Sequence, residues 1–563
     1  MKERIILLSL VFLGWIPCRT IAQGLASPPV TTFNPDTSLP KVQVPEFVIT
    51  GKAEIELPRA YKPSIEIDSS YFQDKNLPGT VVNVPVGLSL SRQQQVGNNG
   101  FPNLFVKASI GHYTTTNYVV SGAAETGGGF VVNGSVNGGY SGGFIPFTMR
   151  RNVSVLAGIS KDLQFDQSSM SSNSIEFGYS RSSYFLYGQL GPTSPYLRQN
   201  DDINLKLNSN MDLQNVPLAV GLTFDRSSIV DYWDAVESSI ALDASTQIPV
   251  SSGWIGGHGT VQFGTHTVDA VTPSPVITLY LPSSNVNRSL YRINLGADYA
   301  SAALDRDFSF SIGLNYFQYR DDSSSGIAKL FPDIRLNYRL SSESALFARY
   351  TGTIRQSGLS DLVSTDRFID ASVPLLSTQE YGLIAVGSRV AISNEVSLTP
   401  QFNVDLARYY PMFISGADNS SFLVYADRAT VFSFSFAADY VKGDFDAAAT
   451  LKFQKGRTNS LSDIPNLSPI TFDLSAAYQF VPNLTLSGEM LLLSPRYADM
   501  TLTRKVGSAG LLSARLSYDV KLGTLPVEFF VEGQNLFNQR YFIWQGYQEL
   551  PLSLFVGFSS RIL

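Results

Sequence analysis

Apolar and polar residues alternate at every second position along most of the chain after about residue 100. The four clearest runs cover residues 291–299, 308–316, 432–440 and 512–521. Such alternation gives each strand one apolar face and one polar face. The runs extend over roughly nine to eleven residues, which is enough for a tilted strand to cross the hydrocarbon core of a membrane. The pattern therefore predicts a transmembrane antiparallel β-barrel.

A soluble β-sandwich is the alternative, because its strands also alternate. Sandwich strands are usually shorter, near five or six residues, and their outer face is the polar one. Tyr299, Tyr316, Tyr440 and Tyr518 lie at the ends of several runs, as expected of the aromatic belts at lipid–water boundaries. Run length and aromatic placement favour the barrel.

Short and long polar stretches separate the runs in turn. Tight turns are predicted at 341–343, 393–395, 442–444 and 481–483. Longer polar stretches cover 355–379, 410–421 and 456–469. Short periplasmic turns and long external loops are typical of outer-membrane barrels. The alternation predicts an all-β fold: a barrel of about 22 strands preceded by an extended N-terminal segment.

Composition agrees with a barrel and disfavours helical membrane proteins. Only 16% of the 563 residues are charged, whereas soluble proteins average about a quarter. Beyond the N-terminus, no apolar run reaches the ~18 residues that a transmembrane helix requires. The formal net charge of −6 argues against a nucleic-acid partner.

The first 100 residues divide into two predicted segments. Residues 1–22 are interpreted as a signal peptide, since Lys2 and Arg4 precede an apolar stretch and Thr20-Ile21-Ala22 supplies small residues for cleavage. The only cysteine, Cys18, lies in it, so the mature chain has no disulfide or thiolate metal site. Lipidation of Cys18 is an alternative that the preceding Trp15-Ile16-Pro17 disfavours. Residues 23–100 form a Pro-rich periplasmic or lumenal segment, and 101–563 the barrel.

A motif near the C-terminus resembles a known family. Its residues are Asn535, Leu536, Phe537, Tyr541, Gly546, Tyr547 and Pro551, followed by a short alternating last strand. This run is similar to the final two barrel strands of TonB-dependent outer-membrane receptors. Residues 104–120 resemble the first barrel hairpin of that family, but nothing comparable to its plug domain is found. The final strand also departs from the family, with Leu552-Ser553 after the proline and Leu563 at the end.

A second short resemblance lies in the Pro-rich segment. Glu46, Phe47, Val48, Ile49, Thr50 and Gly51 are similar to the extended TonB box that opens mature receptors of this family. Such a segment pairs with an energising protein by strand addition. The alternative is an ordinary apolar pentapeptide.

The resemblance implies a receptor or transporter in the cell outer membrane that binds or passes a ligand without covalent chemistry. Its implied partners are outer-membrane lipid, the barrel-insertion machinery, and a TonB-type energising protein or a separate plug or lid chain. A lumen of this width needs filling, by the Pro-rich segment, by inward-folded loops such as 355–379, or by another chain. A passive porin and a structural or assembly scaffold that docks envelope proteins are the alternatives.

Candidate chemistry is sparse. The three histidines, His112, His258 and His266, include two on one strand face about 27 Å apart, too far for a shared metal. A Ser–His hydrolase dyad that uses one of these histidines is the alternative, but no serine motif indicates one. We predict no catalytic, cofactor or metal site, and no enzymatic activity. Inward charges of both signs are predicted to form a paired network that stiffens the wall. The aromatic run 541–544 is interpreted as an interfacial anchor, with ligand contact as the alternative.

Overall fold

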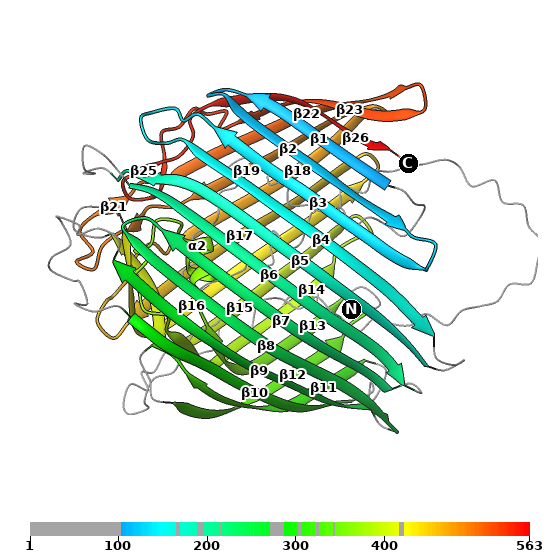
Figure 1. The fold of residues 1–563 in the computed structure, drawn as a ribbon, viewed down its shortest axis with the longest axis vertical. Helices are drawn as coiled ribbons and strands as arrows, with labels where there is room; N and C mark the ends of the chain where they lie inside the picture. Colours follow the sequence, from blue (N-terminus) through cyan, green and yellow to red (C-terminus); the bar gives the residue numbers. More distant parts are fainter. Residues whose placement is uncertain are drawn as a thin grey trace, which may run out of the picture.

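The computed structural model describes residues 103–562 except 165–168, 189–195, 214–215, 252, 271–285, 302–306, 323–325, 342–343 and 416–420. These residues build one barrel wall and the connections between its strands (Figure 1). No separate plug domain occurs among them. The predicted signal peptide and Pro-rich segment lie outside the described residues.

Twenty-two antiparallel strands form the wall. They are β1 (Asn103–Gly111), β2 (Thr115–Glu125), β3 (Phe130–Ser141), β4 (Arg150–Gln164), β5 (Ser169–Leu186), β6 (Tyr196–Leu213), β7 (Val216–Val230), β8 (Trp233–Val250), β9 (Gly253–Ala270), β10 (Val286–Ser301), β11 (Phe308–Arg320), β12 (Ile327–Arg339), β13 (Ala345–Gln356), β14 (Ser377–Ala391), β15 (Val396–Ser415), β16 (Phe422–Lys442), β17 (Phe445–Thr458), β18 (Ile470–Val481), β19 (Leu484–Leu493), β22 (Ala509–Leu522), β23 (Leu525–Gln534) and β26 (Ser553–Ile562).

Pairing between the first and last strands closes the ring. Leu104 lies opposite Ile562, and the antiparallel register continues to Gly111 opposite Phe555. Closure leaves no free edge in the wall, so the backbone N–H and C=O groups at membrane depth are paired within the sheet. The predicted count of about 22 strands is confirmed.

The two ends of the barrel differ in the length of their connections. At one end the connections are tight, such as 443–444 and 482–483, and Asn103 and Ile562 lie there. At the other end they are longer and carry three small elements: helix α2 (Leu359–Thr365) and the hairpins β20 (Arg496–Tyr497)–β21 (Lys505–Val506) and β24 (Phe542–Trp544)–β25 (Tyr547–Gln548). Short turns mark the periplasmic end and long loops the external end.

Large apolar side chains cover the outside of the wall. Leu330, Phe263 and Leu295 are more than half exposed, which is a usual value for a lipid-facing side chain and an unusual one in a soluble protein. Residues at the intervening positions, such as Asn294 and Lys329, point into the lumen. The predicted alternation of strands β10, β11, β16 and β22 is confirmed. Among the described residues, no helix has the length and apolar character needed to span a bilayer.

One predicted loop begins too early. The stretch 410–421 was expected to be loop, but β15 continues to Ser415 and pairs with β16 beyond a bulge between Ala407 and Tyr410. Pro411 and the irregular pattern at the bulge hide the continuation, because a bulge shifts which residues face inward. Tyr410, Met412 and Phe413 are buried under the external loops and do not face lipid.

An arginine introduced at mid-depth should distinguish the lipid-facing side of the wall from the lumen-facing side. Replacing outward Leu222 by Arg should lower the free energy of unfolding by about 2–4 kcal/mol, since the guanidinium then faces hydrocarbon. The neighbouring Thr223→Arg places the same group in the lumen and should cost less than about 1 kcal/mol. Unfolding of both variants in phosphatidylcholine vesicles measures this, and equal losses would contradict the assignment of faces.

Candidate functional site: a strap across the external mouth

The connection between β13 and β14 forms the candidate functional site. These residues, 357–376, are called the strap here. Three aspartates order it locally, because their carboxylates accept nearby backbone N–H groups: Asp361 caps the start of helix α2, and Asp366 and Asp370 each begin a turn. Asp361 accepts the N–H of Gly358 at 3.1 Å, Asp366 that of Phe368 at 2.9 Å, and Asp370 that of Ser372 at 2.9 Å. The strap is therefore ordered by its own sequence.

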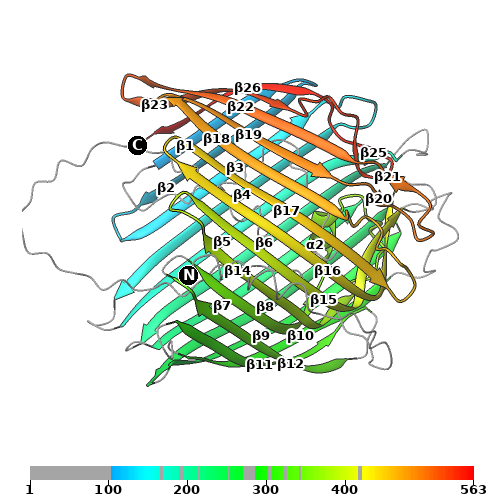
Figure 2. The same ribbon diagram turned by 180° about the vertical axis from the view of Figure 1, so that it is seen from behind.

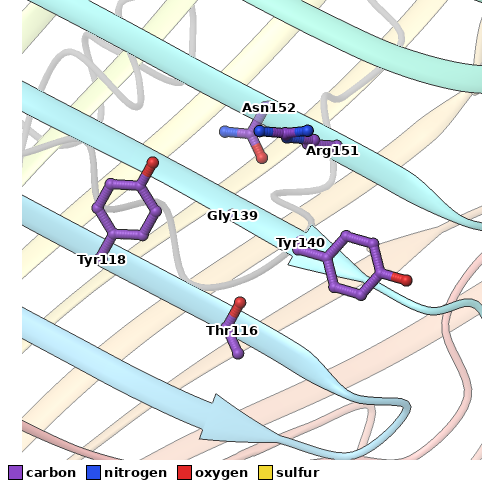
Figure 3. Close-up of a pocket in the computed structure, with 6 residues that line it drawn as sticks. All are labelled: Thr116, Tyr118, Gly139, Tyr140, Arg151 and Asn152. Carbon is purple, nitrogen blue, oxygen red and sulfur yellow. The ribbon is translucent and has the colours of Figure 1, made fainter.

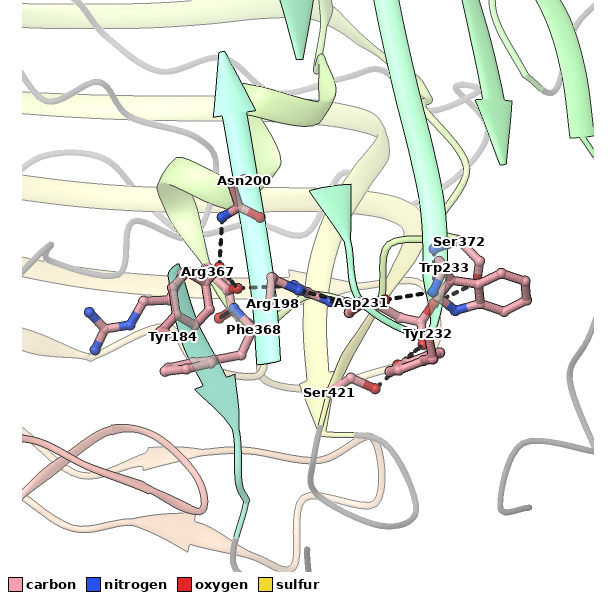
Figure 4. A network of polar contacts seen from close by, with 12 residues as sticks. Tyr184, Arg198, Asn200, Asp231, Tyr232, Trp233, Arg367, Phe368, Ser372 and Ser421 are labelled. Atoms are coloured by element: carbon pink, nitrogen blue, oxygen red, sulfur yellow. Dashed lines mark hydrogen bonds and ion pairs between the residues drawn. The ribbon is translucent and has the colours of Figure 1, made fainter. Parts of the chain in front are cut away.

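A buried ion pair fixes the middle of the strap to the wall at β5 and β6 (Figure 4). Arg198 donates to Asp231 at 2.5 and 2.8 Å, and both side chains are fully buried. The same guanidinium donates to the carbonyl oxygen of Arg367 at 3.0 Å, and the Tyr184 hydroxyl donates to that oxygen at 2.5 Å. Two wall residues thus converge on one backbone carbonyl of the strap.

Asp370 and Phe368 of the strap join two distant parts of the ring. The Tyr232 hydroxyl donates to Asp370 at 2.8 Å, from the connection between β7 and β8. Asp370 N–H donates to the carbonyl of Phe422 in β16 at 2.7 Å, and Phe422 N–H donates to the carbonyl of Phe368 at 2.9 Å. Since β7 and β16 lie far apart around the ring, the strap crosses the mouth.

The end of the strap is held at the third side of the ring. Asp322, after β11, accepts the N–H of Leu375 at 2.8 Å and contacts His266 Nδ1 at 2.9 Å. Asp321 accepts the N–H of Ser377 at 2.8 Å. At the start of the strap, Leu359 N–H donates to Glu237 of β8 at 2.5 Å. Both ends and the middle of the strap are therefore bonded to the wall.

Apolar side chains pack the strap into a cluster that joins distant strands. On the strap the buried members are Leu359, Leu362, Phe368, Ile369, Ala371, Val373 and Leu375. On the wall and the other loops they include Leu186, Ile229, Val268, Leu290, Phe413, Phe422, Leu493, Leu511 and Trp544. Burial of apolar surface is the main favourable term in such packing. The external mouth consequently has its own small hydrophobic core.

The family-like C-terminal motif lies in the loop between β23 and β26, beside the strap. Tyr547 stacks on Phe368 with ring centroids 3.5 Å apart and an interplanar angle of 14°. Asn535, at a φ of 49°, donates to the carbonyls of Gln539 at 2.8 Å and Leu550 at 3.0 Å, which closes its loop. Leu536 and Phe537 are exposed. The structure thus places one motif residue, Tyr547, directly against the strap.

The aromatic run 541–544 is not an interfacial anchor. Tyr541, Ile543 and Trp544 are buried, and Trp544 packs edge-on against Phe413 and Phe422. The prediction was wrong because sequence alternation cannot tell an apolar loop that covers a neighbouring loop from one that faces lipid. The predicted TonB-box-like residues Glu46–Gly51 lie outside the described residues.

Burial changes the acid–base behaviour of the strap. Asp366 is completely buried, and this burial raises its pKa to about 8, although Phe368 N–H and the guanidiniums of Arg198 and Arg367 oppose the rise. The ion pair with Glu549 at 2.6 Å outweighs burial and raises the pKa of Arg367. The docked strap therefore favours a neutral Asp366.

The predicted network of inward charges is present in part. Arg335 and Arg349 both contact Asp333, at 2.8 and 3.9 Å, and Arg515 pairs with Glu528. Below the strap, Arg355 lies 3.3 Å from Glu380, which is fully buried. Of the three histidines, His266 has a structural role, in the contact with Asp322 that holds Leu375. Within the described residues no group of three potential ligands could hold a metal ion.

Several residues that hold the strap in place were not predicted from the sequence, namely Tyr184, Arg198, Asp231, Asp322 and Asp370. They are far apart in the chain, and only barrel closure brings them to one end. A local signal existed in the strap itself, where Asp361, Asp366 and Asp370 recur between apolar residues. That pattern is typical of an ordered loop with a buried side and not of a solvated one.

Removal of the buried arginine should release the strap. Release is measured by maleimide labelling of a cysteine introduced by Ala371→Cys, in a chain with Cys18 replaced by Ser. Ala371 is completely buried, so this cysteine is protected while the strap is docked. Arg198→Met leaves Asp231 buried and unpaired, at a cost of about 3–5 kcal/mol. Maleimide labelling of the introduced cysteine should therefore rise about 100-fold or more.

The matched control is Arg181→Met on the neighbouring strand. Arg181 pairs with Asp201 at 2.5 Å but is half exposed, so its loss should change labelling less than about five-fold. Similar labelling of the two variants would show that the buried pair does not hold the strap.

The contribution of Asp366 to strap docking should weaken as pH rises. A released Asp366 titrates near its ordinary pKa of 3.8, whereas the docked one titrates at about 8, so docking retains a proton between these values. The contribution of Asp366 to docking is largest below pH 4 and falls until about pH 8. The labelling rate of Ala371→Cys is divided by the labelling rate of Ala371→Cys/Asp366→Asn at each pH. This ratio should rise between about pH 4 and pH 8. A flat ratio would refute the protonated Asp366.

The fold is that of several solved outer-membrane proteins. The FrpB iron transporter from Neisseria meningitidis matches with a TM-score of 0.64 and 12% identity, over 83% of this chain and 82% of that one. The copper transporter OprC has a TM-score of 0.61 at 11% identity, over 82% and 81% of the two chains.

The pyoverdine receptor FpvA from Pseudomonas aeruginosa PAO1 has a TM-score of 0.61 at 10% identity, over 82% of this chain and 78% of that one. No protein-family model and no curated protein sequence matches the chain. The chain has the 22-strand barrel fold of TonB-dependent receptors of the cell outer membrane.

Proposed function

We propose that this chain is an outer-membrane receptor or transporter that binds or passes a ligand without covalent chemistry. The observation that supports the proposal is the strap, which is hydrogen-bonded to β6, β8 and β16 and to the connections after β7 and β11. A 22-strand wall encloses a lumen far wider than small solutes need. Closure of its external mouth by a pinned loop fits gated passage better than free diffusion.

The fold neighbours support the transport part of the proposal. The structures compared above are an iron transporter, a copper transporter and a receptor bound to pyoverdine. Their identities to this chain, 10% to 12%, support the general function and leave the ligand of this chain open.

Energised opening is the finer part of the proposal. The Glu46–Gly51 segment would pair with a TonB-type protein by strand addition, and the pull would be transmitted to the barrel contents. Replacing Val48 by Cys and cross-linking to a single-cysteine TonB-type C-terminal domain tests this step. A cross-link that disappears after deletion of residues 41–57 supports energised transport, and no cross-link at all contradicts it.

Conductance tests closure by the strap. Planar bilayers containing the full chain should show little steady current, because the mouth is blocked. Replacing residues 358–375 with a short Gly-Ser linker should give large open channels, at least ten-fold above the parent conductance, as expected of an unfilled lumen of about 22 strands. Steady large currents from the parent chain would identify a passive porin.

The scaffold alternative predicts a different pair of results. If the barrel only docks other envelope proteins, neither the parent nor the linker variant needs a conducting path. Heat-modifiable mobility of both proteins in detergent is the control, since it shows that the wall remains folded. A folded linker variant without current would therefore favour the scaffold.

A further inference from the structure

Arginines form a band on the outer surface near the external end of the barrel. Each occupies an outward position of its strand, in phase with exposed apolar residues; they are Arg151, Arg226, Arg320, Arg428 and Arg457. Arg457 lies opposite Thr430 of β16. Phe432, two residues after Thr430, is exposed on the same face. Arg320 lies opposite Tyr291 in the same way. We call these residues the arginine band.

The arginine band lies just beyond the hydrocarbon layer. Phe308, Tyr440 and Phe445 occupy outward positions at the periplasmic end of strands β11, β16 and β17. About 12 residues at about 3.4 Å each and a tilt of about 45° place the arginines on these strands roughly 29 Å above them. The apolar band of such barrels is about 25 Å tall. The arginines therefore lie at the level of the external lipid headgroups.

The arginine band is not neutralised by the protein. Two outward basic residues near this end have carboxylate partners: Arg181 pairs with Asp201 and Lys455 with Asp463. Within the described part of the chain, no ion pair involves Arg428 or Arg457. The nearby carboxylate of Asp427 instead accepts the N–H and hydroxyl of Ser460, at 3.2 and 2.6 Å. Two adjacent positive charges thus remain for an external anion.

Arg428 and Arg457 share a notch on the outer surface of β15–β17. Its volume is about 320 Å³, and Leu406, Thr430 and Asn459 also line it. These strands face the viewer in Figure 2. The notch offers two guanidiniums, a hydroxyl and an amide above an apolar surface. That set of donors suits a phosphate group attached to a lipid chain.

A second notch lies across the barrel, on β2–β4 (Figure 3). Tyr118, Tyr140 and Arg151 line it, and Gly139 forms part of its floor. Its volume is also about 320 Å³. Tyrosines at this depth are typical of the membrane interface. It repeats the same combination of an outward arginine and an interfacial surface, with one guanidinium instead of two.

We infer that the notch between Arg428 and Arg457 binds the anionic, phosphate-bearing headgroup of a lipid of the external leaflet. Arginine costs little at this level, whereas at mid-depth it costs about 2–4 kcal/mol, so its placement fits a headgroup contact. Bidentate donors on two neighbouring strands hold a phosphate more tightly than one mobile charge. The bound lipid joins β16 to β17 beside the external loops.

A photo-cross-linking amino acid at Thr430 tests the site, because Thr430 lines this notch only. The full chain is placed in phosphatidylcholine nanodiscs that contain increasing amounts of diphosphoryl lipid A. Cross-linking to lipid A should saturate in the parent. In Arg428→Gln/Arg457→Gln the half-saturating amount should rise about 25-fold, at about five-fold for each arginine. Each single variant should give an intermediate shift.

The control removes two positive charges at the other end of the wall. Lys161→Gln/Lys442→Gln should leave the titration unchanged, since Lys442 ends the same strand on the periplasmic side, where it pairs with Glu395 at 3.0 Å. Heat-modifiable mobility shows that each variant is folded. An unchanged titration in the arginine variants, or equal cross-linking to phosphatidylcholine, would overturn the inference. Full displacement by inorganic phosphate would assign the notch to a soluble anion and overturn it too.

Discussion

Backbone hydrogen bonding in a medium without water is the constraint on which this structure depends. Hydrocarbon offers no partner for an unpaired N–H or C=O group, so a strand-built protein can cross a membrane only as a closed ring. The pairing of β1 with β26 supplies that closure. Once the ring is closed, outward positions must be apolar and inward positions are free to be polar, which produces the alternation along the chain. Closure also creates a lumen, and the wide lumen creates the need for the strap.

The strap closes the lumen through the same interactions that stabilise the core of a soluble protein. Leu359, Leu362 and Phe368 bury apolar surface, while the Arg198–Asp231 pair satisfies charges that burial would otherwise penalise. A buried pair of this kind contributes more to a defined position than to net stability, because its desolvation cost offsets much of its attraction. The strap is thus held in one place by contacts whose loss is costly, a property suited to a gate.

The wall could be predicted from the sequence far better than the mouth. Alternation, turn residues and aromatic ends are local signals, so the strand number and the lipid-facing residues of β10, β11, β16 and β22 followed from them. The strap depends on contacts such as Arg198 with the carbonyl of Arg367, which are 169 residues apart. No periodicity encodes such a contact. The same limit explains why the run 541–544 was interpreted as an interfacial anchor: Trp544 is buried against Phe413 and Phe422, which come from another part of the ring.

In this structure the chain closes its own external mouth. A cryo-electron microscopy map of the full chain in lipid nanodiscs, without added ligand, tests it most directly. Continuous density is expected for residues 357–376 across the mouth, joined to the wall at Arg198 and at Asp322. Density for a complete 22-strand wall around an open external mouth, with the strap outside it, would show that the chain does not close its own mouth.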